Sequence, residues 1–357
     1  MQKLDDGAGR AAIVTVDLSP FTDTSLRDFE RLEAGQALVE ACHNLGFVKI
    51  TGHGFTKEEL DVAFAWTKRL FDLSYEEKMT APHPPGPMPH RGYSGIGVEK
   101  IYSKEDMENP DCSKDVGQEL RKIMDFKARH PLESYEIGSE QDDQQQNIWL
   151  PHEVLPGFQD YMNSLYERLA GVGKMILAAF GVGLGLDPDA TTALMHLCSE
   201  RHCQLRLLHY PDIEREKLLR ELVARLPPHT DWSTFTMLFQ DNSGGLELRD
   251  PSTQQFLHAR PEEGVLVLNI GDMFQRFSND HFVSALHRVA VPEAGTVSES
   301  RIPARYSIPF FVSPAPSHTV ETLPQFVAPG TPIKYAPIKF QDYNAFISKY
   351  QYQSGGL

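Results

Sequence analysis

Pro228-His229-Thr230-Asp231-Trp232 is the stretch that decides the fold, about two-thirds of the way along the 357-residue chain. His229 and Asp231 are two residues apart, so on a β-strand both side chains leave the same face. A neutral imidazole beside a carboxylate suits a divalent metal ion. The best third ligand is His287, in the segment SALHRV at 284–289, because the 56 residues after Asp231 (287 − 231) allow several strands to return. Two histidines and one carboxylate predict a non-haem Fe(II) site.

Two alternatives to this metal site remain open from the residues alone. His281 is a competing third ligand, although its neighbours Asn279 and Asp280 are typical of a turn. Zinc also accepts two histidines and a carboxylate.

A second pair with the same spacing follows the third ligand. Arg305 and Ser307 are also two residues apart, so on a strand the guanidinium and the hydroxyl point the same way. A guanidinium fork with an added hydroxyl donor is well suited to a small carboxylate. A metal triad followed by a carboxylate site predicts an enzyme that holds an oxo-acid on iron, and a zinc hydrolase would not need that second site.

At these residues the chain resembles the Fe(II)/2-oxoglutarate-dependent dioxygenases of the isopenicillin N synthase-like branch, and within it the fungal thymine 7-hydroxylase-like enzymes. The resemblance runs from about residue 13 to about residue 316. It rests on the HxD…H…RxS order and on several shorter motifs: ESYEIG at 133–138, LRLLHYP at 205–211, LFQD at 238–241, GGL at 244–246 and RYSI at 305–308.

The resemblance implies a ligand set and two co-substrates. Fe(II) would be held by His229, Asp231 and His287, which is preferred to His281 because the following Arg-Val matches the family. The far carboxylate of 2-oxoglutarate would be held by the Arg305 and Ser307 pair. Tyr210 matches a position that also contacts this co-substrate. Molecular oxygen would take a remaining position on the metal.

The resemblance also implies a pocket for a small-molecule substrate. Arg206, Trp232 and Phe311 would be its walls, and an inward Arg206 would want a carboxylate or an amide-like edge. A salt bridge within the barrel is an equal alternative for Arg206. Ile338 and Phe340 would cap the pocket, or would pack the last helix. These residues favour an amino acid, a nucleobase-like ring or a natural-product intermediate as the substrate.

Composition excludes several other classes of partner. A net charge of −15 and a pI near 5.4 argue against nucleic acid and against an anionic membrane surface. Four cysteines without a CxxC pair are no disulfide framework, and neither a signal peptide nor an apolar run of membrane-spanning length is visible. We therefore expect a cytoplasmic protein.

The pattern of apolar residues predicts a mainly β fold with flanking helices, namely a double-stranded β-helix (jelly roll) core buttressed by N-terminal helices. After residue 204 the pattern predicts short strands at 205–210, 234–239, 246–249, 265–269, 283–289 and 305–312, whereas long apolar stripes predict helices at 57–73 and 158–180. We expect one catalytic unit over 1–357: a support region (1–200), a jelly-roll core (201–316) and a C-terminal cap (317–357). A charged helix is expected at 214–225, and the polar stretch 102–130 is expected to be a surface insertion or a lid.

These observations predict an oxygenase that oxidises an unactivated C–H bond of a small metabolite, by hydroxylation, desaturation or ring closure. The first alternative is an isopenicillin N synthase-like oxidase that uses no 2-oxoglutarate, in which Arg305 and Ser307 would hold the substrate's own carboxylate. The second is a catalytically silent binding protein. Release of succinate separates the first alternative, and iron-dependent uptake of oxygen separates the second.

Overall fold

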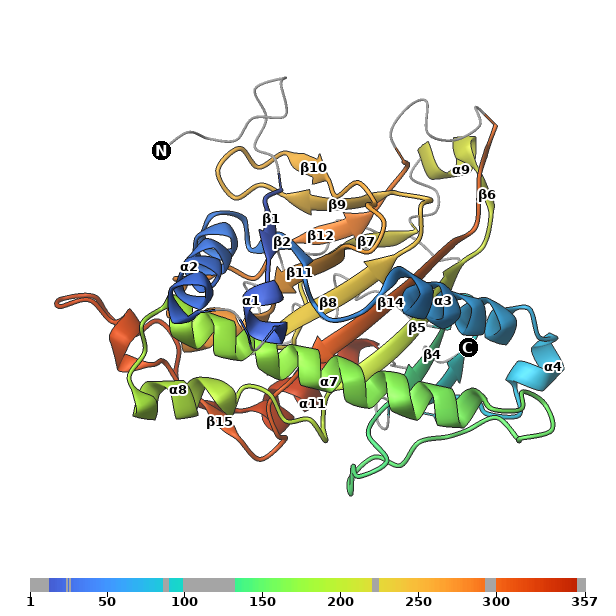
Figure 1. Ribbon diagram of the computed structural model, residues 1–357. Helices are drawn as coiled ribbons and strands as arrows, with labels where there is room; N and C mark the ends of the chain where they lie inside the picture. The colour runs from blue at the N-terminus through green and yellow to red at the C-terminus, as the bar shows by residue number, and fades with distance from the viewer. Residues whose placement is uncertain are drawn as a thin grey trace.

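A computed structural model describes residues 13–23, 25, 27–85, 90–98, 132–219, 225–292 and 300–351. The stretch 102–130, expected to be an insertion or a lid, lies outside these residues. Within them, two β-sheets form the centre of the molecule (Figure 1). The larger sheet has eight strands in the order β1-β2-β11-β8-β14-β5-β4-β3 and the smaller has four in the order β10-β9-β12-β7. This is the mainly β, jelly-roll architecture that the strand pattern predicts.

The strands of the larger sheet come from the whole length of the chain. They are β1 (Thr15–Asp17), β2 (Phe47–Thr51), β3 (Gly92–Ser94), β4 (Glu133–Ile137), β5 (Gln204–Tyr210), β8 (Phe235–Gln240), β11 (Leu266–Ile270) and β14 (Arg305–Val312). The smaller sheet contains β7 (Leu226–His229), β9 (Leu246–Arg249), β10 (Phe256–His258) and β12 (His287–Val289). Two short pairs lie at the edges: β6 (Ile213–Glu214) with β13 (Arg301–Ile302), and β15 (Thr319–Val320) with β16 (Ile338–Lys339).

Helices cover one face of the larger sheet, where α7 (Phe158–Gly183) runs across the strands between α2 (Asp28–Leu45) and α3 (Lys57–Phe71) (Figure 1). The other helices are short apart from the last: α1 (Ser19–Thr22), α4 (Tyr75–Lys78), α8 (Pro188–Met195), α9 (Arg215–Leu219), α10 (Asp272–Phe277), the 3₁₀ helix η1 (Pro324–Phe326) and α11 (Phe340–Gln351). Among the described helices, none combines the length and the apolar composition that a membrane span needs.

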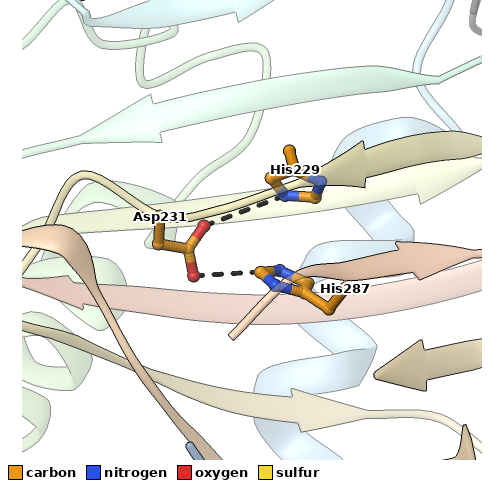
Figure 2. A group of neighbouring side chains, drawn as sticks. All are labelled: His229, Asp231 and His287. Carbon is orange, nitrogen blue, oxygen red and sulfur yellow. Dashed lines mark ion pairs between the residues drawn. The ribbon is translucent and has the colours of Figure 1, made fainter. Parts of the chain in front are cut away.

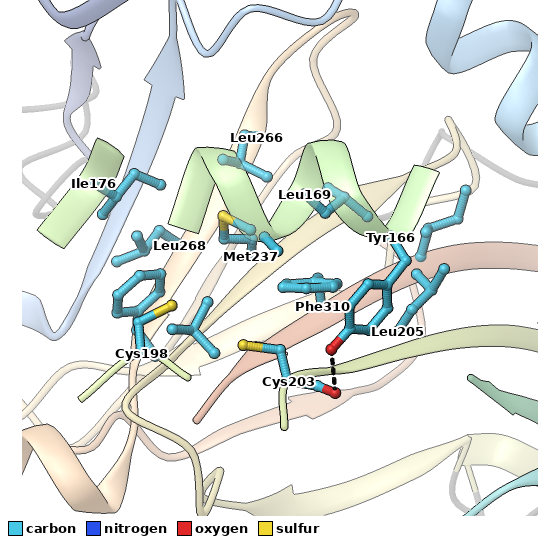
Figure 3. Close-up of a cluster of buried hydrophobic side chains, with 14 of the residues drawn as sticks. Tyr166, Leu169, Ile176, Cys198, Cys203, Leu205, Met237, Leu266, Leu268 and Phe310 are labelled. Carbon is cyan, nitrogen blue, oxygen red and sulfur yellow. Dashed lines mark hydrogen bonds between the residues drawn. The ribbon is translucent and has the colours of Figure 1, made fainter. Parts of the chain in front are cut away.

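Alternation along β14 divides the interior into a core and a cavity. Ile308, Phe310 and Val312 are buried in the main hydrophobic core, where α7 packs on the sheet through residues such as Leu169 and Ile176 (Figure 3). The side chains between them, from Arg305 to Phe311, line a cavity on the opposite face. One strand therefore supplies both the packing that holds the fold and the wall of the site.

The contact between α2 and α7 depends on two glycines. A Cβ on Gly35 would lie 2.7 Å from the carbonyl oxygen of Ala179. A Cβ on Gly183 would lie 2.1 Å from the carbonyl oxygen of Gly35. The two helix backbones therefore touch at this crossing. This close approach explains why a glycine stands on the buried face of α2, where it would otherwise weaken the helix.

Two sequence-based boundaries are wrong. The charged, exposed helix expected at 214–225 includes neither end of that range, because residue 214 pairs with β13 and Arg225 is not helical and is buried with its guanidinium on backbone carbonyl groups. Its described part is α9, and residues 220–224 lie outside the described residues. The strand expected at 283–289 begins only at His287. The amide of Ser284 bonds instead to the side chain of Gln275, so this part of the segment joins no ladder.

Candidate active site

Three potential metal ligands meet between β7 and β12 (Figure 2). His229 is the last residue of β7, His287 is the first of β12, and the two are directly paired in register. Asp231 lies in the segment that follows β7, with Oδ1 3.8 Å from His229 Nε2 and Oδ2 3.8 Å from His287 Nε2. The predicted triad is thus assembled, although only His229 of the HxD pair lies within a strand.

Backbone carbonyl groups orient both imidazole rings toward the same point. The Nδ1 atom of His229 is 2.8 Å from the carbonyl oxygen of Pro227, and that of His287 is 2.9 Å from Ala285. An Nδ1–H that donates to a carbonyl leaves the Nε2 lone pair free for a metal ion. Burial, and next the neighbouring His287, lower the pKa of His229 to about 4, so this ring is neutral at pH 7.

The carboxylate of Asp231 is fixed by two hydrogen bonds. Thr236 Oγ1 and Asn269 Nδ2 donate to its Oδ2 at 2.6 and 2.7 Å, and Asp231 is only 6% exposed. Burial alone would raise the pKa of Asp231, but the two imidazoles and these hydrogen bonds lower it overall, so the group is ionised. Sequence reasoning missed both donors. The signal for Asn269 is an amide within the otherwise apolar strand β11.

The three donor atoms fit one divalent cation. All lie within 4.8 Å of one another, and they comprise two imidazole nitrogens and one carboxylate oxygen. That donor set is the facial triad of non-haem iron sites, which leaves positions on the metal open. His281 does not join it, because its ring stacks on His43 with centroids 4.4 Å apart.

Arg305 and Ser307 lie side by side in the wall of the same cavity. Arg305 is 1% exposed, and its Nη1 atom donates to Ser307 Oγ at 3.0 Å. Its Nη2 atom donates to Gln240 Oε1 at 3.2 Å, and its Nε atom finds no hydrogen-bond partner in the described parts of the chain. Within the described residues Arg305 makes no ion pair, so a buried cation with a spare donor faces the cavity. This arrangement fits a carboxylate of a small molecule.

Neighbouring residues hold the Arg305 guanidinium in place. The amide of Gln240 donates to the carbonyl oxygen of Ala259 at 3.1 Å, which turns its oxygen toward Arg305. The guanidinium carbon lies 5.0 Å from the centre of the Tyr210 ring, whose residue pairs with Arg305 across β5 and β14. Gln240 positions Arg305. The sequence showed it only as part of the LFQD motif at 238–241 and did not indicate this contact.

A cavity of about 260 Å³ joins the triad to this arginine. Its lining includes nearly all residues expected at the site: His229, Asp231, His287, Arg305, Ser307, Tyr210, Arg206, Trp232, Phe311 and Phe340. Ile338 is not part of the lining. It lies in β16, where it pairs with Val320, so its place in the fold is that of a packing residue.

The part of the cavity around Arg206 is polar and internally paired. The Nε atom of Arg206 lies 2.7 Å from Glu136 Oε1, and Arg91 Nη2 lies 2.8 Å from Asp142 Oδ2. All four residues line the cavity. Burial raises the pKa of Glu136 to about 7, against the lowering effect of Gln204, Ser134 and Arg91. Arg206 therefore lies where sequence reasoning placed it, but with a protein carboxylate already beside it.

Comparisons with known proteins show the family of the chain. Residues 13–152 match a model described as the non-haem dioxygenase in morphine synthesis N-terminal family, and residues 201–314 match the 2OG-Fe(II) oxygenase superfamily. The 2-oxoglutarate-Fe(II) type oxidoreductase ppzD of Metarhizium rileyi is 37% identical over 309 residues, covering 86% of this chain and 82% of its own. The proline hydroxylase buaE of Petromyces alliaceus is 35% identical over 302 residues, covering 84% and 87%.

A solved structure shares the fold over almost the whole chain. The thymine 7-hydroxylase of Neurospora crassa in complex with alpha-KG and thymine has a TM-score of 0.79 and 29% sequence identity, covering 95% of this chain and 97% of its own. The chain therefore belongs to the 2OG-Fe(II) oxygenase superfamily and is a dioxygenase that uses Fe(II) and 2-oxoglutarate.

Proposed function

We propose that His229, Asp231 and His287 hold the iron, that Arg305 and Ser307 hold the far carboxylate of 2-oxoglutarate, and that Tyr210 also contacts this co-substrate. The observation that carries this proposal is the guanidinium of Arg305, which is buried and has no ion-pair partner among the described residues. Burying such a charge is costly unless an anion arrives to pair with it. The cavity that connects it to the triad supplies the space for one small dicarboxylate.

The bound iron supplies the oxidation chemistry, in which molecular oxygen converts 2-oxoglutarate to succinate and carbon dioxide while the prime substrate is oxidised. The protein's own residues position the reactants. The hydrogen bonds to Pro227 and Ala285 fix the two rings, and those from Thr236 and Asn269 fix the carboxylate. The enclosing strands keep bulk water away from the reacting atoms.

The prime substrate is proposed to be a small metabolite with a neutral, amide-like edge and an unactivated C–H bond. Among the described residues, the polar part of the cavity contains two arginines and two carboxyl groups in two close pairs, and burial raises the pKa of one of these carboxyl groups, Glu136, to about 7. A balanced set of donors and acceptors suits a neutral polar edge better than a free carboxylate. Trp232, Phe311 and Phe340 add aromatic walls that suit a ring.

Two related proteins support this choice. The Neurospora structure holds thymine, a ring with amide-like edges, and the Petromyces relative is named a proline hydroxylase. A substrate panel should therefore pair cyclic amides with free amino acids of similar size. We expect oxygen-dependent release of succinate to be coupled to a mass change only with members that carry the neutral edge. Coupling with the free amino acids alone would contradict the proposed substrate class.

Succinate also separates the remaining alternative. In an oxidase that uses no 2-oxoglutarate, the substrate would change mass without release of succinate, and Arg305 would bind the substrate. The buried Arg305 fits the carboxylate of 2-oxoglutarate and the carboxylate of a prime substrate alike. The 2-oxoglutarate-dependent relatives favour 2-oxoglutarate as its ligand.

We further propose that the three regions 1–200, 201–316 and 317–357 act as one catalytic unit, because β1–β4 belong to the same sheet as β5, β8, β11 and β14.

The net charge of −15 supports action on small molecules in the cytoplasm, without a nucleic-acid or membrane partner. Imaging of a tagged full chain tests the location, and a location on a membrane would contradict it.

A further inference from the structure

Arg225 is a second buried arginine near the proposed co-substrate site. It immediately precedes β7 and is 1% exposed. Its Nη2 atom donates to the carbonyl oxygens of Pro211 at 3.1 Å, Ile302 at 3.4 Å and Pro303 at 2.5 Å. In the part of the chain that the structure describes, its Nε and Nη1 atoms have no hydrogen-bond partner. The guanidinium is thus held through a single nitrogen atom, Nη2.

The charge of Arg225 is not compensated by a contacting carboxylate. Within the described residues it makes no ion pair. Burial, and next the charge of Arg305, lower its pKa to about 10, so it remains a cation at pH 7. Asp212 and Asp241 act on it from a distance, but Asp212 pairs with Arg301, and Asp241 accepts the Tyr306 amide at 2.6 Å.

The carbonyl groups that bind Arg225 belong to residues close in sequence to the co-substrate site. Pro211 directly follows Tyr210, and Pro303 comes two residues before Arg305. Arg225 is not part of the cavity lining, so it does not contact a ligand there. Two buried cations therefore repel each other beside a cavity, and a carboxylate that arrives next to Arg305 would be attracted by both.

We propose that Arg225 is a positioning residue for the co-substrate, which acts through Arg305 and favours 2-oxo acids that carry a second, distal carboxylate. This inference rests on the proposed assignment of Arg305 and Ser307 to that carboxylate. The competing role for Arg225 is purely structural, as a clamp on three carbonyl groups. A clamp would matter equally for every ligand, whereas a charge acts on the distal carboxylate alone.

The test compares two ligands on the full-length, Fe(II)-loaded protein without oxygen. 2-Oxoglutarate carries the distal carboxylate and 2-oxobutyrate lacks it, so the ratio of their dissociation constants, measured by calorimetry, reports recognition of that group. Arg225→Gln keeps an N–H donor for the carbonyls but removes the charge, and Arg225→Lys keeps the charge. Arg301→Gln is the matched control, because it removes an exposed positive charge from the same edge of the fold.

We expect Arg225→Gln to weaken 2-oxoglutarate on the order of tenfold, which corresponds to about 1.4 kcal/mol, and to leave 2-oxobutyrate within about twofold. Arg225→Lys and Arg301→Gln should stay close to the wild type for both ligands. Equal weakening of the two ligands by Arg225→Gln, or no weakening, would overturn the inference. If the Gln variant does not fold, the folded Lys variant decides, because loss of selectivity with the charge retained also overturns it.

Arg305→Gln separates this inference from the assignment on which it rests. It should remove the preference for 2-oxoglutarate over 2-oxobutyrate altogether. If that preference survives Arg305→Gln, the assignment of the co-substrate site itself is wrong. If only Arg225→Gln leaves the preference intact, the site stands and the role of Arg225 falls.

Discussion

Arg305→Gln is the substitution that most sharply tests the co-substrate site. Glutamine can still donate one hydrogen bond to Ser307, but it removes the positive charge and the forked geometry. Arg305 is 1% exposed and makes no ion pair among the described residues, whereas the other arginines of the cavity lining, Arg91 and Arg206, already lie beside carboxylates.

The size of the effect follows from those contacts. Removing one partner of a buried charge pair costs about 2–5 kcal/mol, much of it from the carboxylate left unpaired. At 1.4 kcal/mol per factor of ten, the dissociation constant of 2-oxoglutarate should rise by roughly 30-fold to several thousandfold. Ser307→Ala removes only one neutral donor, worth about 1 kcal/mol, and should weaken binding by less than about tenfold.

The assay is succinate release at varied 2-oxoglutarate and fixed prime substrate, then the reverse, with direct calorimetric binding as a check. The apparent KM for 2-oxoglutarate should rise far more than that for the prime substrate. Thermal unfolding of both variants controls for loss of the fold. An unchanged affinity for 2-oxoglutarate with a collapsed affinity for the prime substrate would refute the reasoning and favour the oxidase.

Three further predictions concern packing and pH. Gly35→Ala should lower the free energy of unfolding by about 1–3 kcal/mol because its Cβ would meet the backbone of α7, whereas Gly171→Ala, with nothing within 4 Å, should be neutral or stabilising by up to about 1 kcal/mol in the same denaturation assay. Gly271→Ala places a Cβ 2.2 Å from the carbonyl oxygen of Ser233 and 3.0 Å from that of Asp231, so calorimetry should show weaker metal binding, and wild-type affinity would contradict the steric argument. Burial raises the pKa of Glu136 from 4.5 to about 7, so its contribution to stability is full below pH 4.5 and is lost as the pH rises through 7. In that window the free energy of unfolding of the wild type should fall, relative to that of Glu136→Gln, by up to about 1.4 kcal/mol per pH unit in the denaturation assay. Parallel curves of unfolding free energy against pH for the two proteins would exclude this pKa shift.

The sequence predicted best those elements whose pattern is local. The bounds of β9 and β14 agree with the predicted strands, because alternating apolar residues end at clear turn signals. The triad could be predicted because two ligands share one short motif and a family order supplied the third. The helix expected at 214–225 was wrong at its two ends, because a run of charged residues is typical of an exposed helix and nothing local shows that residue 214 pairs with β13 or that Arg225 is buried.

The rest of the site depends on contacts between distant segments. Glu136 approaches Arg206 because β4 and β5 are neighbours, with these residues paired in register across 70 positions of sequence (206 − 136). Asn269 reaches Asp231 through the pairing of β11 with β8. Such partners are fixed by strand order, which a single sequence does not display.

The most direct test of the central claim is a calorimetric titration of the metal-free protein with Fe(II), without oxygen, followed by 2-oxoglutarate. We expect the wild type to bind one Fe(II) per chain, and to bind 2-oxoglutarate strongly only after the metal. Asp231→Ala should lose the metal, the co-substrate and turnover while keeping the fold by circular dichroism. Full metal binding and turnover by Asp231→Ala would contradict the assignment of the iron site.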